Sequence, residues 1–317
     1  MRIYQHYLIE DRRPTFLLTT MGCAIALMTL SYQASAQEED FQITGSLGVG
    51  GEYNDNVSVS ELESATGESD SATTVDGAID LSWQANEKTN VTGGYSLSSQ
   101  HYSEFEDFDM DMHLLYGDIS YDLPFLTVGA NHYFADAQLG GDDFLELNQS
   151  SVYAGKLIND QWYLRAALNV SDKEFTGFSG RNADTIGASL DAFWFFNQGN
   201  SSLVLAWAID DEDAEQRQFA YTSNTIRLRY SHDTSLWGRA SEISAGIRNQ
   251  VRDYDGITPS IGQTRDDEQL VADIEWSLNL TDHIATKAAF EHGDYSSRLP
   301  SADYQENRMR LGLELSF

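Results

Sequence analysis

The sequence predicts an all-β protein, a single antiparallel transmembrane β-barrel of about 14 strands. Three observations support this prediction. Apolar and polar residues alternate in segment after segment beyond Glu39, each segment about ten to fourteen residues long. The connections between the segments are alternately short and long, as the turns and loops of such barrels are. A third observation is the amphipathic last segment, which ends in Phe317.

The first 36 residues have the features of a secretory signal peptide. Arg12 and Arg13 precede an apolar run at 16–30, and the small residues Ala34-Ser35-Ala36 follow it. The run is shorter than the roughly 20 residues that a spanning helix needs. We therefore expect residues 1–36 to be removed and residues 37–317 to form the barrel. Because the only cysteine, Cys23, precedes this cleavage site, we expect neither a disulfide nor thiol chemistry.

The last segment shows the alternation most clearly. Its apolar side chains share one face and its polar ones the other: Met309, Leu311, Leu313, Leu315 and Phe317 against Arg308, Arg310, Gly312, Glu314 and Ser316. Two such faces fit a barrel wall that separates lipid from water. The same pattern predicts fourteen strands, an even number as in single-chain bacterial barrels, at 41–53, 74–84, 90–103, 110–121, 125–137, 146–157, 161–174, 183–196, 201–210, 218–231, 239–253, 266–280, 283–294 and 304–317.

The connections predict which end of the barrel faces the periplasm. Short turns are expected at 85–89, 122–124, 158–160, 197–200, 232–238 and 281–282. Mostly longer loops are expected at 54–73, 104–109, 138–145, 175–182, 211–217, 254–265 and 295–303. Because outer-membrane barrels have short periplasmic turns, we expect both ends of the barrel chain in the periplasm. Tryptophans near the short turns fit an interfacial aromatic girdle: Trp83, Trp162, Trp194, Trp237 and Trp276.

Composition and motifs exclude several functions. The net charge of −31 would repel a phosphate backbone, so we expect no nucleic-acid partner. The sequence has no glycine-rich phosphate loop, no His-Glu-x-x-His motif and no nucleotide fingerprint. We therefore expect no cofactor, no metal site and no enzymatic activity. The alternative is a hydrolase at the outer rim, which would use His292 and Asp294.

Charged side chains fall on the faces that we expect to line the interior. The basic ones are Arg165, Arg227, Arg229, Arg248, Arg252, Lys287, Arg308 and Arg310. The acidic ones are Glu242, Asp273, Glu275, Glu291 and Glu314. They form either a charge ladder that polarises a pore or a network that ties the walls together. Because both signs occur, we favour the network, since buried charges need partners.

Acidic residues are concentrated in the predicted outer loops. They are Glu61, Glu63, Glu68 and Asp70; Glu104, Glu106, Asp107 and Asp109; Asp142 and Asp143; and Asp210, Asp211, Glu212, Asp213 and Glu215. Such carboxylates could share divalent cations with lipopolysaccharide phosphates, because Ca²⁺ and Mg²⁺ prefer oxygen ligands. A solvated acidic surface would have the same composition. These loops suggest an alternative function, a closed structural or adhesive barrel that binds cations, lipopolysaccharide or a surface partner.

The stretch from Gly45 to Val57, which includes Tyr53-Asn54-Asp55-Asn56-Val57, resembles the first strand and turn of several barrel families. It is similar to the C-terminal barrel of surface lipoprotein assembly modifiers, and to outer-membrane porins found with exopolysaccharide genes. The terminal Phe317 resembles the signal by which the outer-membrane assembly machinery recognises its clients. The resemblance implies an export or translocation barrel. The helical periplasmic domain usual in the assembly modifiers is not expected here, because the mature chain should enter its first strand almost at once.

Together these features predict an outer-membrane barrel that acts as a non-enzymatic channel, porin or export barrel. Its expected partners are outer-membrane lipids, lipopolysaccharide, the assembly machinery and a transported substrate.

Overall fold

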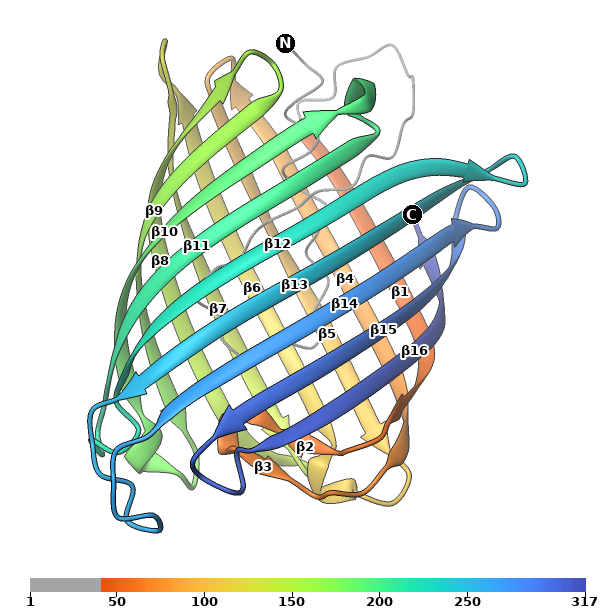
Figure 1. Ribbon diagram of the computed structural model, residues 1–317. Coiled ribbons are helices and arrows are strands. Elements are labelled where there is room, and N and C mark those ends of the chain that lie inside the picture. Colours follow the sequence, from red (N-terminus) through yellow and green to blue (C-terminus); the bar gives the residue numbers. More distant parts are fainter. Residues whose placement is uncertain (1–40) are drawn as a thin grey trace.

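The chain forms a closed barrel of fourteen antiparallel strands in which β1 pairs with β16 to complete the ring (Figure 1). The computed structural model describes residues 41–317, and the predicted signal peptide lies outside this range. The prediction of a single antiparallel barrel with fourteen strands is confirmed. No helix in the described part is long and apolar enough to cross a membrane.

The barrel strands are β1 Phe41–Asn54, β4 Asp70–Asn86, β5 Thr89–Tyr102, β6 Met110–Asp122, β7 Thr127–Leu139, β8 Asp142–Ile158, β9 Trp162–Phe175, β10 Ala183–Phe196, β11 Ser201–Ala214, β12 Tyr221–Leu236, β13 Arg239–Tyr254, β14 Asp266–Asn279, β15 Ile284–Ser297 and β16 Tyr304–Ser316. The connection from β1 to β4 holds two very short strands, β2 Ser58–Val59 and β3 Ser64–Ala65. Single 3₁₀ turns occur at η2 Ser60–Leu62, η3 Glu106–Phe108, η4 Ser179–Arg181 and η5 Asn197–Gly199.

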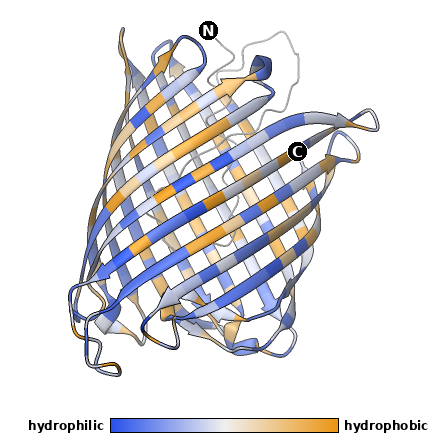
Figure 2. Cartoon of the chain, in the orientation of Figure 1, coloured by the Kyte–Doolittle hydropathy of each residue, from blue (hydrophilic) through white to orange (hydrophobic). Residues whose placement is uncertain are grey.

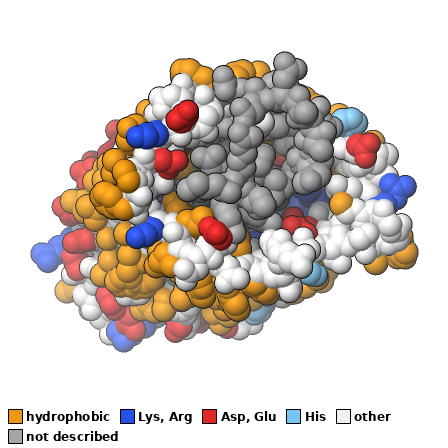
Figure 3. Space-filling view, turned by 90° about the horizontal axis from the view of Figure 1, so that it is seen from above, with side chains coloured by type: hydrophobic (Ala, Val, Ile, Leu, Met, Phe, Trp, Pro, Cys, Tyr) orange, Lys and Arg blue, Asp and Glu red, His pale blue; other side chains and the backbone are white. Residues whose placement is uncertain are grey.

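Alternation along each strand gives the barrel an apolar outside and a polar interior. In β16, Leu311 is 65% exposed on the outside, whereas Glu306 is 1% exposed in the interior. Apolar and polar residues alternate along the strands in Figure 2, and hydrophobic side chains gather on the outside of the barrel in Figure 3. A lipid-facing surface cannot offer hydrogen bonds to the backbone, and ring closure satisfies those groups strand by strand.

The two ends of the barrel differ in their connections. One end, called the turn end here, has the connections 87–88, 123–126, 159–161, 197–200, 237–238 and 280–283. The other, called the loop end, has 55–69, 103–109, 140–141, 176–182, 215–220, 255–265 and 298–303. Both Phe41 and Phe317 lie toward the turn end, which by the rule for such barrels faces the periplasm.

The loop expected at 138–145 is wrong in length, because β7 and β8 are joined by only Gly140 and Gly141. Both glycines have positive φ angles, 60° and 83°, a conformation that allows a tight reversal without a Cβ clash. Several acidic residues expected in loops therefore lie in strands that are longer than the sequence pattern indicated. They are Asp70, Asp142, Asp143, Asp210, Asp211, Glu212 and Asp213.

Inward tyrosines lie flat over glycines of the preceding strand. A Cβ added to Gly94 of β5 would come within 2.7 Å of the Tyr116 ring of β6. The Tyr116 hydroxyl donates to Asp80 of β4, so one side chain ties three strands together. Tyr153 of β8 repeats the arrangement: it covers Gly129 of β7 and donates to Asp118 of β6 over 3.0 Å. These tyrosine braces fix the register of neighbouring strands.

The ring closes at a seam between β1 and β16. A Cβ added to Gly45 would lie 2.6 Å from the Phe317 ring, so the aromatic side chain lies over the glycine. Two backbone hydrogen bonds join the same residues, Gly45 N–H to Phe317 O at 2.8 Å and Phe317 N–H to Gly45 O at 3.0 Å. Phe317 thus packs against the first strand, whatever part it plays in recognition by the assembly machinery.

The tyrosine braces predict that a side chain added at Gly129 destabilises the barrel. We expect Gly129→Ala to lower the free energy of unfolding by about 1–3 kcal/mol, because the methyl group would displace the Tyr153 ring. Urea unfolding of refolded protein in detergent measures this. The matched control is Gly117→Ala on β6, where an added Cβ meets nothing within 4 Å. Equal stability of the two variants would contradict the brace.

Candidate functional site

Residues 55–69 form a loop that folds across the loop end of the barrel, and we call it the mouth loop. It contains β2, η2 and β3, and Figure 1 shows β2 and β3 lying across that end. Its base is narrow, because Gly67 N–H donates to Asn56 Oδ1 over 2.9 Å. The loop therefore leaves β1, crosses the barrel mouth and returns to β4.

Apolar side chains of the mouth loop pack on the inner wall. Val57 is fully buried against Ala72 and Tyr102, near the point where the loop leaves β1. Farther along, Val59 packs in a cluster with Phe144 and Phe175 on β8 and β9, and the partly buried Leu62 packs against this cluster. The loop therefore spans the mouth from the β4–β5 wall to the β8–β9 wall.

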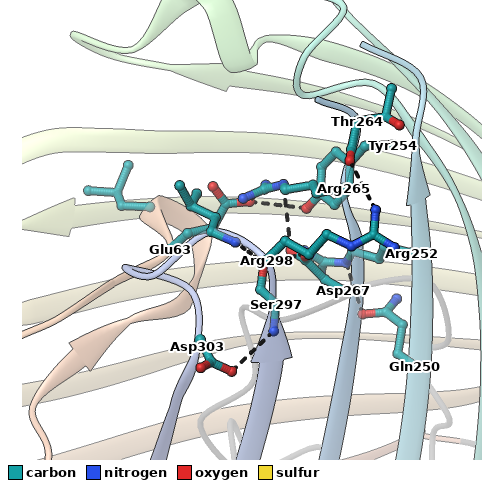
Figure 4. Close-up of polar contacts among 12 residues, drawn as sticks. Glu63, Gln250, Arg252, Tyr254, Thr264, Arg265, Asp267, Ser297, Arg298 and Asp303 are labelled. Carbon is teal, nitrogen blue, oxygen red and sulfur yellow. Dashed lines mark hydrogen bonds and ion pairs between the residues drawn. The ribbon is translucent and has the colours of Figure 1, made fainter. Parts of the chain in front are cut away.

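A buried ion cluster holds the centre of the mouth loop. Glu63 forms ion pairs with Arg181, at 2.9 Å, and with Arg265, and it accepts a hydrogen bond from the Tyr254 hydroxyl at 3.0 Å. The Arg265 guanidinium lies 4.0 Å above the centroid of the Tyr254 ring. Figure 4 shows Glu63 pointing toward Arg265 and Tyr254. These partners come from the connections 176–182 and 255–265 and from β13, so the cluster joins three parts of the barrel to the mouth loop.

Two of the four carboxyl groups of the mouth loop, those of Glu61 and Glu63, have pKa values shifted in opposite directions. Burial by itself would raise the pKa of Glu63, but the Arg181 and Arg265 guanidinium groups outweigh it and hold the pKa below the ordinary 4.5. Burial raises the pKa of Glu61 above that value. Among the described residues, Glu61 Oε1 has no hydrogen-bond partner. Glu63 is therefore the charged anchor of the mouth loop.

A second set of contacts ties the start of the mouth loop to β16. The Ser58 hydroxyl donates to Glu306 Oε2 over 2.7 Å, and the Asn56 side-chain amide donates to the Gln305 carbonyl over 2.8 Å. With the apolar contacts and the ion cluster, the loop is held at three points around the ring. Most of these contacts are polar and none is covalent.

The structure brings several of the predicted lumenal charges together. Arg229 forms ion pairs with Asp273 at 3.0 Å and Glu275 at 2.9 Å, and Lys287 pairs with Glu314 at 2.7 Å. Other predicted residues pair with acids that the prediction did not include: Arg165 with Asp191 at 3.8 Å, Arg308 with Glu306 at 2.9 Å and Arg310 with Glu52 at 2.9 Å.

The remaining predicted charges lie on the same arc of the wall. Arg227 of β12 and Arg248 of β13 are opposite each other in the register of the two strands, and Glu291 is opposite Arg308. Arg252 Nε donates to Gln250 Oε1 over 3.1 Å, and its guanidinium lies 4.9 Å from the centroid of the Tyr221 ring. The arc from β9 to β16 thus carries both signs of charge in close contact.

The opposite arc, from β1 through β8, is different, and the sequence analysis missed it. Four aspartates of β4 and β6 are half-buried on inward positions: Asp76, Asp80, Asp118 and Asp122. Between residues 41 and 155 the only basic residue is Lys88, in a connection at the turn end. Hydroxyl groups hold two of these aspartates, Ser98 to Asp76 at 2.9 Å and Thr127 to Asp122 at 2.6 Å, and the tyrosine braces hold the others. We call this arc the acidic wall.

The residues of the alternative rim hydrolase lie on β15 and bond to amide side chains of β16. His292 Nδ1 contacts Asn307 Oδ1 at 2.9 Å, and Asp294 accepts from Gln305 Nε2 at 3.0 Å. His292 and Asp294 are two positions apart on β15, so their side chains lie on the same face of the sheet. Within residues 41–317, no group of three or more His, Cys, Asp or Glu residues is arranged to hold a metal ion.

No protein-family model matches the chain, and no curated protein matches it. Solved structures do resemble it. OmpT, an outer membrane protein of Vibrio cholerae, in its trimer form has a TM-score of 0.52 at 10% identity, over 87% of this chain and 99% of that one. A loop L8 deletion mutant of OmpT has a TM-score of 0.51 at 8% identity, over 88% and 100%. An anion-selective porin from Comamonas acidovorans has a TM-score of 0.49 at 10% identity, over 87% and 99%. The two likenesses to OmpT show the fold of an outer-membrane β-barrel.

The ion cluster predicts that Glu63→Gln releases the mouth loop. The change leaves Arg265 buried without its anion, which should cost the closed position about 3 kcal/mol and raise the open fraction about a hundredfold. A thiol placed in the loop by Val59→Cys reports the opening through its rate of labelling by a maleimide. The control is Glu68→Gln, an exposed acid of the same loop, which should leave the rate unchanged. Equal rates in Glu63→Gln and the parent would show that the cluster does not hold the loop.

The lowered pKa of Glu63 predicts a transition in acid. A carboxyl whose pKa is lower in the closed state stabilises that state above its ordinary pKa, and the stabilisation is lost as the pH falls through the lowered value. The mouth loop should therefore open below pH 4.5. Pepsin, which is active there, should cleave it near Leu62 only in that range. In Glu63→Gln, which lacks the titrating carboxyl, the opening of the loop should not change with pH in this range. If the parent and the variant show the same dependence of cleavage on pH, Glu63 is not the group responsible.

Proposed function

We propose that this protein is a non-enzymatic outer-membrane channel whose passage is closed at the outer end by the mouth loop. The observation that carries this proposal is the interior, in which charged side chains occur from one end of the barrel to the other, beside one apolar cluster of Tyr163, Phe193, Phe195 and Val204. Asp122 and Glu314 lie toward the turn end, Asp80 and Arg229 lie farther along, and Glu52 lies near the mouth. The half-buried carboxylates on the acidic wall favour an interior that contains water, because an ionised group loses much solvation energy in an interior without water.

The mouth loop has the construction of a removable cover. It is a single loop between β1 and β4, and the two ends of the loop lie close together. It can therefore move away from the mouth without breaking the pairing of the barrel strands. Three sets of contacts hold it: the Glu63 ion cluster, the packing of Val57 and Val59, and the hydrogen bonds to β16. Loss of one partner from the buried ion cluster leaves the other charge unpaired, which is strongly destabilising. A solute would pass when the loop is displaced toward the exterior.

Small solutes are favoured over a protein cargo. The resemblance to surface lipoprotein assembly modifiers would add lipoprotein export, but the mouth loop crosses the route that a polypeptide would take. We therefore propose passive passage of small polar solutes.

A closed structural or adhesive barrel is the second candidate. The buried ion cluster favours it, because Glu63 is 8% and Arg265 3% exposed, and such a cluster would also suit a permanent plug. In that case the loop would be part of the fold and the acidic residues at the loop end would be its working surface.

Single-channel recording in planar bilayers separates the two candidates. The variant to compare with the parent lacks residues 57–66, which joins Asn56 to Gly67, two residues that are already hydrogen-bonded. We expect rare, small openings from the parent and steady current several times larger from the deletion variant. The control removes 259–262 from the other long loop, outside the mouth loop, and should behave as the parent does.

Silence from both the parent and the deletion variant, each shown to be folded by heat-modifiable mobility in electrophoresis, would refute the channel and leave the closed barrel. Equal steady current from both would retain a channel and refute closure by the mouth loop.

A further inference from the structure

We infer that the acidic wall contains a subsite for a small monovalent cation, formed by the Asp118 carboxylate and the side-chain carbonyl of Asn131. The inference rests on the proposed channel function and gives it a substrate class. The two residues come from neighbouring strands, Asp118 from β6 and Asn131 from β7. They lie opposite each other in the register of that pair.

The pair belongs to a row of oxygen-bearing side chains that crosses five strands on the inward face. In order the row is Thr92, Asp118, Asn131, Ser151 and Asn169, each opposite the next. Side chains opposite each other in an antiparallel pair have Cβ atoms about 4.5–5.5 Å apart. That spacing leaves room for one cation to contact oxygens of both Asp118 and Asn131.

Asn131 provides an observation that is independent of the acidic residues. It is 8% exposed, and its Oδ1 has no hydrogen-bond partner among residues 41–317. Its neighbour in the row cannot supply one from its present position, because the Ser151 hydroxyl donates to Asn169 Oδ1 over 2.7 Å. A buried carbonyl that lacks a donor is costly, and a bound cation would satisfy it.

The charge around the pair attracts cations. Asp80 and Asp122 lie on the same acidic wall, and Lys88 at the turn end is the only basic residue between 41 and 155. On the adjoining arc, the Arg165 guanidinium lies 4.3 Å from the centroid of the Tyr153 ring and 3.8 Å from Asp191. Its charge is therefore balanced in part by a carboxylate of its own.

The donor set identifies the class of ligand. A carboxylate and a neutral carbonyl are hard oxygen donors, which suit alkali and alkaline-earth cations. A single carboxylate balances the charge of a monovalent ion such as Na⁺ or K⁺, whereas a tight Ca²⁺ site gathers more negative charge. A site with one charge and few ligands binds weakly, and a permeating ion must both enter and leave. The subsite therefore concentrates monovalent cations in the passage and gives it a cation preference.

The experiment uses the variant that lacks residues 57–66, with K⁺ and Cl⁻ as the probe ions. Reversal potentials in a KCl gradient give the cation-to-anion permeability ratio, and conductance against KCl concentration shows whether ions bind in the passage. We expect a ratio above one and a conductance that saturates. Asp118→Asn, which keeps the acceptor for Tyr153, should reduce the ratio about fivefold, the effect of a unit charge about 4 Å away in water.

Asn131→Leu separates the subsite from general charge. It removes the carbonyl while keeping the branching of the side chain and without changing charge, and it should abolish the saturation while the barrel stays folded. The matched control is Asp172→Asn, which removes the same charge from an exposed outward position of β9 and should change neither quantity.

The outcomes distinguish this inference from the proposed function. Steady current without cation preference, or with a preference and saturation that survive both variants, overturns the subsite and leaves the channel. A complete absence of current in every variant overturns both, because a subsite for a permeating ion requires a passage.

Discussion

The structure depends on the hydrogen bonding of the backbone in a solvent that offers none. Every strand in the lipid must pair on both edges, and the ring from β1 to β16 is the arrangement that achieves this with a single sheet. Ring closure then forces each strand to have one outward and one inward face. The outward face meets lipid and becomes apolar, so the charges of this acidic chain are confined to the interior and to the two ends. The interior chemistry is a consequence of the fold.

The two arcs of the interior meet this constraint in different ways. On the arc from β9 to β16, acids and bases neutralise each other at short range, as Arg229 does with Asp273 and Glu275. On the acidic wall, hydroxyl groups of serine, threonine and tyrosine orient the aspartates. The first arc stiffens the wall, and the second gathers acidic side chains on one side of the interior. Both interpretations of the lumenal charges, a network and a polarised passage, therefore describe different parts of one ring.

The sequence predicts the barrel well because alternation with a period of two is a local property that is repeated fourteen times. Its failures come from non-local or special geometry. The reversal at Gly140 and Gly141 needs two positive φ angles, and the mixed polar and apolar stretch at 138–145 does not show where the strands end. The position of the mouth loop depends on Glu63 meeting Arg265, 202 positions away, and no local pattern encodes such a meeting. The acidic wall could have been found, since the absence of basic residues from 41 to 155 apart from Lys88 is visible in the sequence.

The tyrosine braces have a consequence for the order of assembly. Tyr153 of β8 packs over Gly129 of β7 and donates a hydrogen bond to Asp118 of β6. It can make both contacts only when the three strands are correctly aligned. A slip of one residue in either pairing would turn the tyrosine or its acceptor to the opposite face of the sheet. Strands added in the wrong alignment would then lack the contact that makes their addition hard to reverse. Each brace can thus act as a checkpoint that retains correctly aligned strands and lets misaligned ones detach.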